Sequence, residues 1–194
     1  MKNYIRLGAS FLTKLLSPPI DIIQNFLGLV ILNRKYSSKL REVKTFVSRE
    51  KLWDFSANHL EASNKSISFL EFGVHTGYSI NYFSKLIKNR NSNLYGFDSF
   101  EGLPESWRNF INIYPAEHFD VGGKIPSTKD PRISFIKGWF NETLPDFLII
   151  NKEKLSNSDY ILIHLDADLY SSTLYVLSSL APITNNFYCI FDEF

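Results

Sequence analysis

The segment Glu71–Ser79 has the residue types of a ligand-binding turn, because an acidic residue is followed by the glycines Gly73 and Gly77. An apolar run precedes this segment, and apolar residues at helical spacing follow it, which predicts a strand, a turn and a helix. Glycine allows positive φ and a close approach between ligand and backbone. The helix N-terminus behind the turn offers free N–H groups to polar atoms. The segment therefore predicts a nucleotide-type ligand and, with it, an enzyme.

A second acidic residue, Asp98, ends the next predicted strand. An acid at this place commonly binds ribose hydroxyls. The glycines are spaced as G-x-x-x-G and not as G-x-G-x-x-G, whose third glycine brings a helix close to a pyrophosphate. This spacing argues against NAD and FAD. It favours a cofactor that has a ribose and no phosphate, and S-adenosylmethionine is the obvious one.

Acidic residues also follow two later strands: Asp166 and Asp168 follow one, and Asp192 and Glu193 follow the other. The carboxyl ends of parallel strands meet at one edge of a sheet, where ligands bind. Clustered like charges repel, so we interpret the convergence as functional. Carboxylates can hold a hard cation such as Mg²⁺, which lowers the pKa of a bound hydroxyl, or can accept its proton. Asp166 is favoured at the site, whereas Asp168 is left open between that role and capping the next helix.

Strands that alternate with helices must position these residues. Near-continuous apolar strands separated by helices predict an α/β fold with a parallel sheet covered on both faces. The long connection 101–131 is rich in aromatic residues, which favours a lid or substrate wall over disorder. The expected strands are 66–72, 93–97, 133–137, 160–165 and 187–191, and the expected helices are 39–62, 79–88, 144–151 and 173–180.

Composition limits the class of protein. The chain has 194 residues, enough for one domain with a core, and its net charge of +1 gives no electrostatic reason to expect a nucleic-acid partner. The only cysteine, Cys189, excludes an internal disulfide framework and fits a reducing, cytoplasmic compartment. His164 lies within a strand and is interpreted as a core histidine. His75 is left open between a cofactor contact and a turn position.

The N-terminal part, residues 1–38, contains two apolar runs separated by Pro18-Pro19. Neither run reaches the roughly 20 residues needed to span a bilayer. Two interpretations stay open: a helical arm that packs on the domain or on a second subunit of a homo-oligomer, and an interfacial helix in weak peripheral contact with a membrane. The expected organisation is an arm over 1–38 and a ligand-binding domain over 39–194.

Four segments resemble the macrocin/mycinamicin O-methyltransferase family, the TylF/MycF-like sugar methyltransferases. Their order and spacing also fit, and the resemblance covers roughly residues 40–194. The two specific segments read Phe-Asp-Ser-Phe-Glu-Gly-Leu-Pro and Asp-Ala-Asp-Leu-Tyr-Ser-Ser-Thr. The segments are 70–79, 96–104, 137–145 and 163–173.

The resemblance implies a Rossmann-like class I methyltransferase that transfers a methyl group from S-adenosylmethionine to a sugar hydroxyl of a small-molecule acceptor, assisted by Mg²⁺. Asp98 would hold the ribose. Apart from the resemblance, Asp166 or Asp168 could be the catalytic base, and Asp166 is favoured because it directly follows the strand. Glu71, Gly73, Gly77 and Ser79 would shape the methionine and ribose end of the cofactor site, Gly138 and Trp139 would border the adenine, and Asp166, Asp192 and Glu193 would hold the metal.

The sequence departs from this family at its C-terminus, because it stops at Phe194, directly after the last acidic pair. Class I methyltransferases usually continue with a helix and two more strands. The expected sheet therefore lacks its last strands, and its fifth strand would be an open apolar edge. Two alternatives stay open: a methyltransferase for a non-sugar hydroxyl and, because of this departure, an inactive binding module of the same fold.

Overall fold

The computed structural model describes residues 41–61, 64–108, 112–183 and 187–192, together with residues 23, 26–28, 30, 31 and 34–39. The chain divides into two compact units. One comprises Met1–Thr45 and Arg108–Ile113, and the other comprises Phe46–Trp107 and Tyr114–Phe194. In the first unit, residues 34–39 are helical, while most of the expected arm lies outside the described residues.

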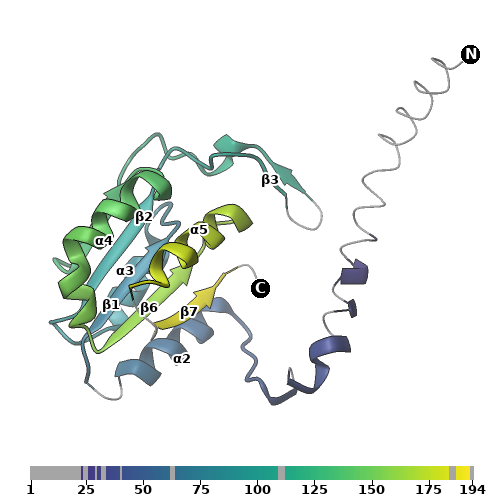
Figure 1. Ribbon diagram of the computed structural model, residues 1–194, viewed down its shortest axis with the longest axis horizontal. Coiled ribbons are helices and arrows are strands. Elements are labelled where there is room, and N and C mark those ends of the chain that lie inside the picture. The colour runs from purple at the N-terminus through teal and green to yellow at the C-terminus, as the bar shows by residue number, and fades with distance from the viewer. Residues whose placement is uncertain are drawn as a thin grey trace, which may run out of the picture. The chain divides into compact units, whose positions relative to one another are not determined.

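The second unit is built on a five-stranded parallel sheet with the strand order β5-β2-β1-β6-β7 (Figure 1). This arrangement confirms the predicted α/β, Rossmann-like fold. The first strand is central, and the chain winds outward from it in both directions. The strands are β1 (Ile67–Phe72), β2 (Asn93–Asp98), β5 (Ile133–Lys137), β6 (Tyr160–Leu165) and β7 (Phe187–Phe191).

Helices lie on both sides of the sheet (Figure 1), and each side has its own apolar core. Side chains of α2 (Arg49–Glu61) and α3 (Tyr78–Leu86) pack on one face, where Trp53 and Phe83 are fully buried. Side chains of α4 (Phe140–Ser156) and α5 (Tyr170–Leu180) pack on the other. Because side chains alternate along a strand, β1 supplies Phe69 to the first core and Phe72 to the second.

The predicted helix over 39–62 is wrong in its first part. Residues 43–48 are not helical, and α2 begins at Arg49. Val43 and Val47, which lie in this part, are both exposed, Val47 by 97%. The face that packs on the sheet is instead formed by Trp53, Ala57 and Leu60, all buried and at helical spacing.

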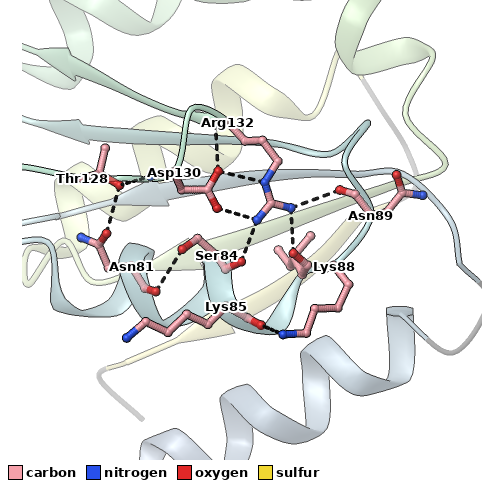
Figure 2. Close-up of polar contacts among 9 residues, drawn as sticks. Asn81, Ser84, Lys85, Lys88, Asn89, Thr128, Asp130 and Arg132 are labelled. Atoms are coloured by element: carbon pink, nitrogen blue, oxygen red, sulfur yellow. Dashed lines mark hydrogen bonds and ion pairs between the residues drawn. The ribbon is translucent and has the colours of Figure 1, made fainter.

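Arg132 fixes the C-terminal end of α3 (Figure 2). Its guanidinium donates to the backbone carbonyls of Ser84 at 2.7 Å, Ile87 at 2.7 Å and Asn89 at 3.1 Å. It also donates to both carboxylate oxygens of Asp130, at 3.0 and 2.6 Å. Every N–H donor of Arg132 is thus used, and carbonyls that a helix end leaves without partners are satisfied.

Most of the connection between β2 and β5 lies among the described residues. It contains the short paired strands β3 (Trp107–Arg108) and β4 (Ile113–Tyr114) and the 3-10 helix η1 (Ala116–Phe119). Within the second unit, the rings of Trp107 and Tyr114 stack with centroids 5.0 Å apart. Within the described part of the chain, no helix is long and apolar enough to cross a membrane.

Candidate active site

A cavity of about 610 Å³ lies at the carboxyl ends of the central strands, within the second unit. This volume is in the range of small-molecule sites. The glycine turn, the end of β2, the segment after β6 and the β2–β5 connection all contribute to its wall. The predicted residues that line it are Gly73, Ser79, Asp98, Trp139, Asp166 and Asp168, and His75 lines it too.

Position 73 requires glycine because of its backbone conformation and because the backbone of Asp166 lies close to it. Its φ is +95°, and a Cβ added there would lie 1.8 Å from the carbonyl oxygen of Asp166. Its N–H donates to the carbonyl of Phe97 at 3.0 Å. The glycine therefore lets the turn after β1 fit between the ends of β2 and β6. Gly77, with φ +80°, is the N-cap of α3 and has no side chain to cap the helix.

Asp98 binds the glycine turn through its carboxylate. One oxygen accepts the backbone N–H groups of Val74 and His75, both at 2.7 Å, and the other accepts that of Phe100 at 2.6 Å. His75 takes a left-handed backbone, with φ of 49°, inside this turn. A carboxylate has about four acceptor positions. Three are used here, so Asp98 keeps capacity for a ligand hydroxyl.

Asp166 and Asp168 line the cavity directly after β6. The N–H of Asp166 donates to the carbonyl of Phe72 at 2.9 Å, which extends the sheet by one residue. At Asp168 φ is 56°, and the N–H of Leu169 donates back to the carbonyl of Ala167, as in a γ-turn. The N-cap position of α5 is Leu169, one residue after Asp168.

Aromatic side chains form much of the remaining wall. Trp107 and Phe119 come from the β2–β5 connection, as expected for a substrate wall, and Tyr175 comes from α5. Trp139 precedes α4 and also lines the cavity. Gly138 itself does not line it, but its N–H donates to the carbonyl of Asp98 at 2.9 Å and keeps the two segments together.

Glu71 lies beneath the cavity and not in its wall. It is fully buried, and its carboxylate is 2.9 Å from Nδ1 of the equally buried His164, its partner in the β1–β6 register. The expected position of Glu71 beside the cofactor is therefore not observed. His164 is a core histidine, as the sequence indicated. Burial lowers the pKa of His164, but the carboxylates of Asp192 and Glu71 outweigh this and raise it to about 9.

Arg49 is the functional candidate that the sequence did not reveal. It begins α2, lines the cavity, and donates to the Asp192 carboxylate at 3.3 Å. Asp192 also lies 3.7 Å from Nε2 of His164. His164 and, more weakly, Arg49 therefore hold the pKa of Asp192 below its ordinary value. No spacing rule connects Arg49 with the glycine turn, because α2 reaches the cavity only through tertiary packing.

Two of the three predicted metal ligands, Asp166 and Asp192, lie among the described residues. Asp166 lines the cavity, whereas the Asp192 carboxylate is directed at Arg49 and His164. Glu193 lies outside the described residues. In the ranges that the structure describes, there is no group of three or more His, Cys, Asp or Glu residues that could hold a metal ion.

Comparisons with known proteins agree with this geometry. A crystal structure of CalS11, a calicheamicin methyltransferase, matches with a TM-score of 0.56 and 22% sequence identity. The match covers 76% of this chain and 66% of the CalS11 chain, and at this identity it shows the fold alone. A search of curated proteins finds no match.

A family model described as a methyltransferase domain matches residues 70–188. This range contains the glycine turn, Asp98, Trp139 and the Asp166–Asp168 segment, whereas Arg49 and Asp192 lie outside it. The match spans more than half of the chain. The chain therefore belongs to the methyltransferase-domain family, and this membership implies S-adenosylmethionine as the methyl donor.

Proposed function

We propose that this protein transfers a methyl group from S-adenosylmethionine to a hydroxyl oxygen of a sugar or a sugar-containing metabolite. One observation carries the proposal: a single cavity is lined by the glycine turn, Asp98 and the Asp166–Asp168 segment. The four segments that resemble the TylF/MycF-like sugar methyltransferases support oxygen and a sugar as the acceptor. The fold shared with CalS11 is compatible with this acceptor.

The chain would hold the methyl donor with residues of the glycine turn and of two strand ends. The remaining acceptor capacity of Asp98 suits a ribose hydroxyl. The N–H groups at the start of α3, near Ser79, suit polar atoms of the methionine end. Trp139 offers an aromatic face beside the adenine. When bound, S-adenosylmethionine supplies an electrophilic methyl group on a positively charged sulfur.

The acceptor side of the cavity has to orient a hydroxyl group and take its proton. An alcohol is a poor nucleophile until this proton leaves, and a carboxylate in hydrogen-bond reach can accept it. We assign this role to Asp166, which directly follows β6 and lines the cavity. Trp107, Phe119 and Tyr175 would hold the acceptor's ring against the donor, since correct alignment supplies much of the rate of a transfer between two bound molecules.

Asp166 and Asp168 are the residues that would hold Mg²⁺ in this proposal. Mg²⁺ is commonly held by one or two carboxylates together with water and substrate oxygens. Both residues line the cavity, so they would divide the roles of metal ligand and proton acceptor. Asp192, which was also expected as a ligand, does not line the cavity and pairs with Arg49. When bound, Mg²⁺ would lower the pKa of the acceptor hydroxyl.

The test is transfer of a labelled methyl group from S-adenosylmethionine to a set of sugar acceptors. We expect Asp166→Asn to lower kcat by about 10²- to 10⁴-fold, the usual contribution of a general base. Affinity for S-adenosylmethionine should fall far less than kcat. Asp146→Asn, an exposed aspartate of α4 outside the cavity wall, is the matched control and should keep full activity.

Other outcomes would change the proposal in defined ways. Transfer only to non-sugar hydroxyls would overturn the sugar assignment and keep the methyl transfer. Binding of S-adenosylmethionine without transfer to any acceptor would favour a binding module of this fold. Loss of transfer in EDTA and its recovery with Mg²⁺ would support the metal, and full activity in EDTA would remove it.

A further inference from the structure

We infer that Arg49 binds the carboxylate of the methionine part of S-adenosylmethionine. This inference rests on the proposed function for the identity of the ligand. It adds a donor-binding residue that precedes the part of the chain matched by the family model. The structure supports it by the way the guanidinium is held, by the donors it keeps, and by the charges around the cavity.

Aromatic rings and a carboxylate hold the Arg49 guanidinium in place. Its central carbon lies 5.2 Å from the ring centroid of Trp53, which is fully buried, and 5.9 Å from that of Tyr78. Its Nη1 donates to Asp192 at 3.3 Å. An arginine that is stacked and paired in this way loses less conformational freedom when a ligand binds. Arg49 is therefore positioned for binding before any ligand arrives.

The guanidinium keeps donors for a ligand. Nη1 binds Asp192, and Nε lies 3.6 Å from the Glu50 carboxylate. Toward the other residues that the structure describes, the guanidinium donates no further hydrogen bond, and the Arg49 side chain is 51% exposed. The planar fork of arginine matches the two oxygens of a carboxylate.

The charges around the cavity have the pattern that the methyl donor needs. Among the described residues that line it, Arg49 is the only lysine or arginine, whereas Asp98, Asp166 and Asp168 are acidic. S-adenosylmethionine carries positive charges on its sulfur and amino group and a negative charge on its carboxylate. The acidic residues suit the positive groups, so Arg49 is left as the partner for the carboxylate.

Tyr78 places Arg49 at the correct end of the cavity. It is the first residue of α3, directly after Gly77, and it lines the cavity together with Arg49. The contact between the Tyr78 ring and the guanidinium therefore brings Arg49 beside the glycine turn. The proposed function assigns this turn to the methionine end of the donor, where the carboxylate would lie.

The experiment compares two ligands that differ by this carboxylate alone. Equilibrium binding of S-adenosylmethionine and of decarboxylated S-adenosylmethionine is measured by calorimetry without any acceptor. We expect the wild-type protein to prefer S-adenosylmethionine, and Arg49→Met to weaken its binding by about 10- to 100-fold, the range of a hydrogen bond to a charged group. Binding of the decarboxylated ligand should change little, which also shows that the variant is folded.

Two further variants complete the test. Arg49→Lys keeps the charge and should recover part of the affinity. Lys51→Met removes a more exposed cation from the same helix, outside the cavity wall, and should change neither ligand's affinity.

Equal weakening of the binding of both ligands by Arg49→Met, or no weakening, would overturn the inference. Arg49→Met could also leave the binding of S-adenosylmethionine unchanged and raise only the KM for an acidic acceptor. Arg49 would then bind a carboxylate of the acceptor, and the inference would also be overturned. A wild-type protein that binds neither ligand would instead refute the proposed function.

Discussion

At the scale of single residues, the site depends on groups that serve the fold and the ligand together. Asp98 ties the glycine turn to the end of β2 with three N–H hydrogen bonds and keeps capacity for a ligand hydroxyl. Gly73 allows the turn to contact the backbone of Asp166. Changes at such residues should therefore alter stability as well as binding.

Gly73→Ala should strongly destabilise the protein. The left-handed backbone costs about 1–2 kcal/mol for a residue with a Cβ, and the clash with the Asp166 carbonyl adds about 1–3 kcal/mol of overpacking. Gly122→Ala is the matched control, because φ there is +68° and a Cβ would meet nothing within 4 Å. Urea unfolding measures both variants. If the two lose equal stability, the contact with Asp166 does not require glycine.

The sequence located the site residues whose position in a motif fixes their place in the fold. Gly73, Asp166 and Asp168 follow strands and Asp98 ends one, and the ends of parallel strands meet at one edge. Glu71, expected beside the cofactor, is buried and does not line the cavity, and a motif does not tell to which face of a strand a side chain points. The side chain of Glu71 lies on the face of the sheet where His164 is buried.

At the scale of elements, α3 connects the glycine turn to the opposite end of the sheet. Its start forms part of the cavity wall, and its end is held by Arg132 (Figure 2). The described sheet strands match the predicted ones to within one residue, because each is a short segment rich in apolar residues. The predicted start of α2 was wrong. Val43 and Val47 continue the helical spacing of apolar residues in the sequence, but both side chains are exposed in the structure.

Arg132→Met should lower the free energy of unfolding by about 2–4 kcal/mol, since the variant removes the guanidinium donors of three carbonyls and of the Asp130 carboxylate. Chemical denaturation measures this loss. Arg90 is exposed and lines the same surface pocket as Arg132. Arg90→Met should therefore change the free energy of unfolding little. Similar effects of both substitutions would show that Arg132 contributes only its charge.

The start of β1 should be sensitive to acid through Asp159. Hydrogen bonds from Lys65, and from the N–H and hydroxyl of Ser66, lower the pKa of Asp159 from 3.8 to about 2. Because the pKa is lower in the folded state, the stabilisation is complete above the ordinary pKa of 3.8 and is lost as the pH falls toward 2. The stability difference between wild type and Asp159→Asn should shrink over this interval. A stability difference between the two proteins that does not change with pH would contradict the predicted acid sensitivity.

At the scale of the whole molecule, the second unit alone contains the cavity and both apolar cores. The parallel sheet brings together residues that lie far apart in the chain, from Arg49 to Asp192. The sequence could predict that residues at strand ends lie together at the cavity. It could not predict the same for Arg49, because the packing of Trp53 against the sheet determines where α2 begins and where its first side chain lies.

The account depends on the cavity being the binding site of the methyl donor. Calorimetric titration of the full chain with S-adenosylmethionine tests this most directly, with Asp98→Ala and, as a control, Asp120→Ala, whose carboxylate accepts an N–H of an exposed turn. We predict one binding site in the wild-type protein, binding about tenfold or more weaker in Asp98→Ala, and unchanged binding in Asp120→Ala. Absence of binding to the wild-type protein, or equal affinity in all three, would contradict the account.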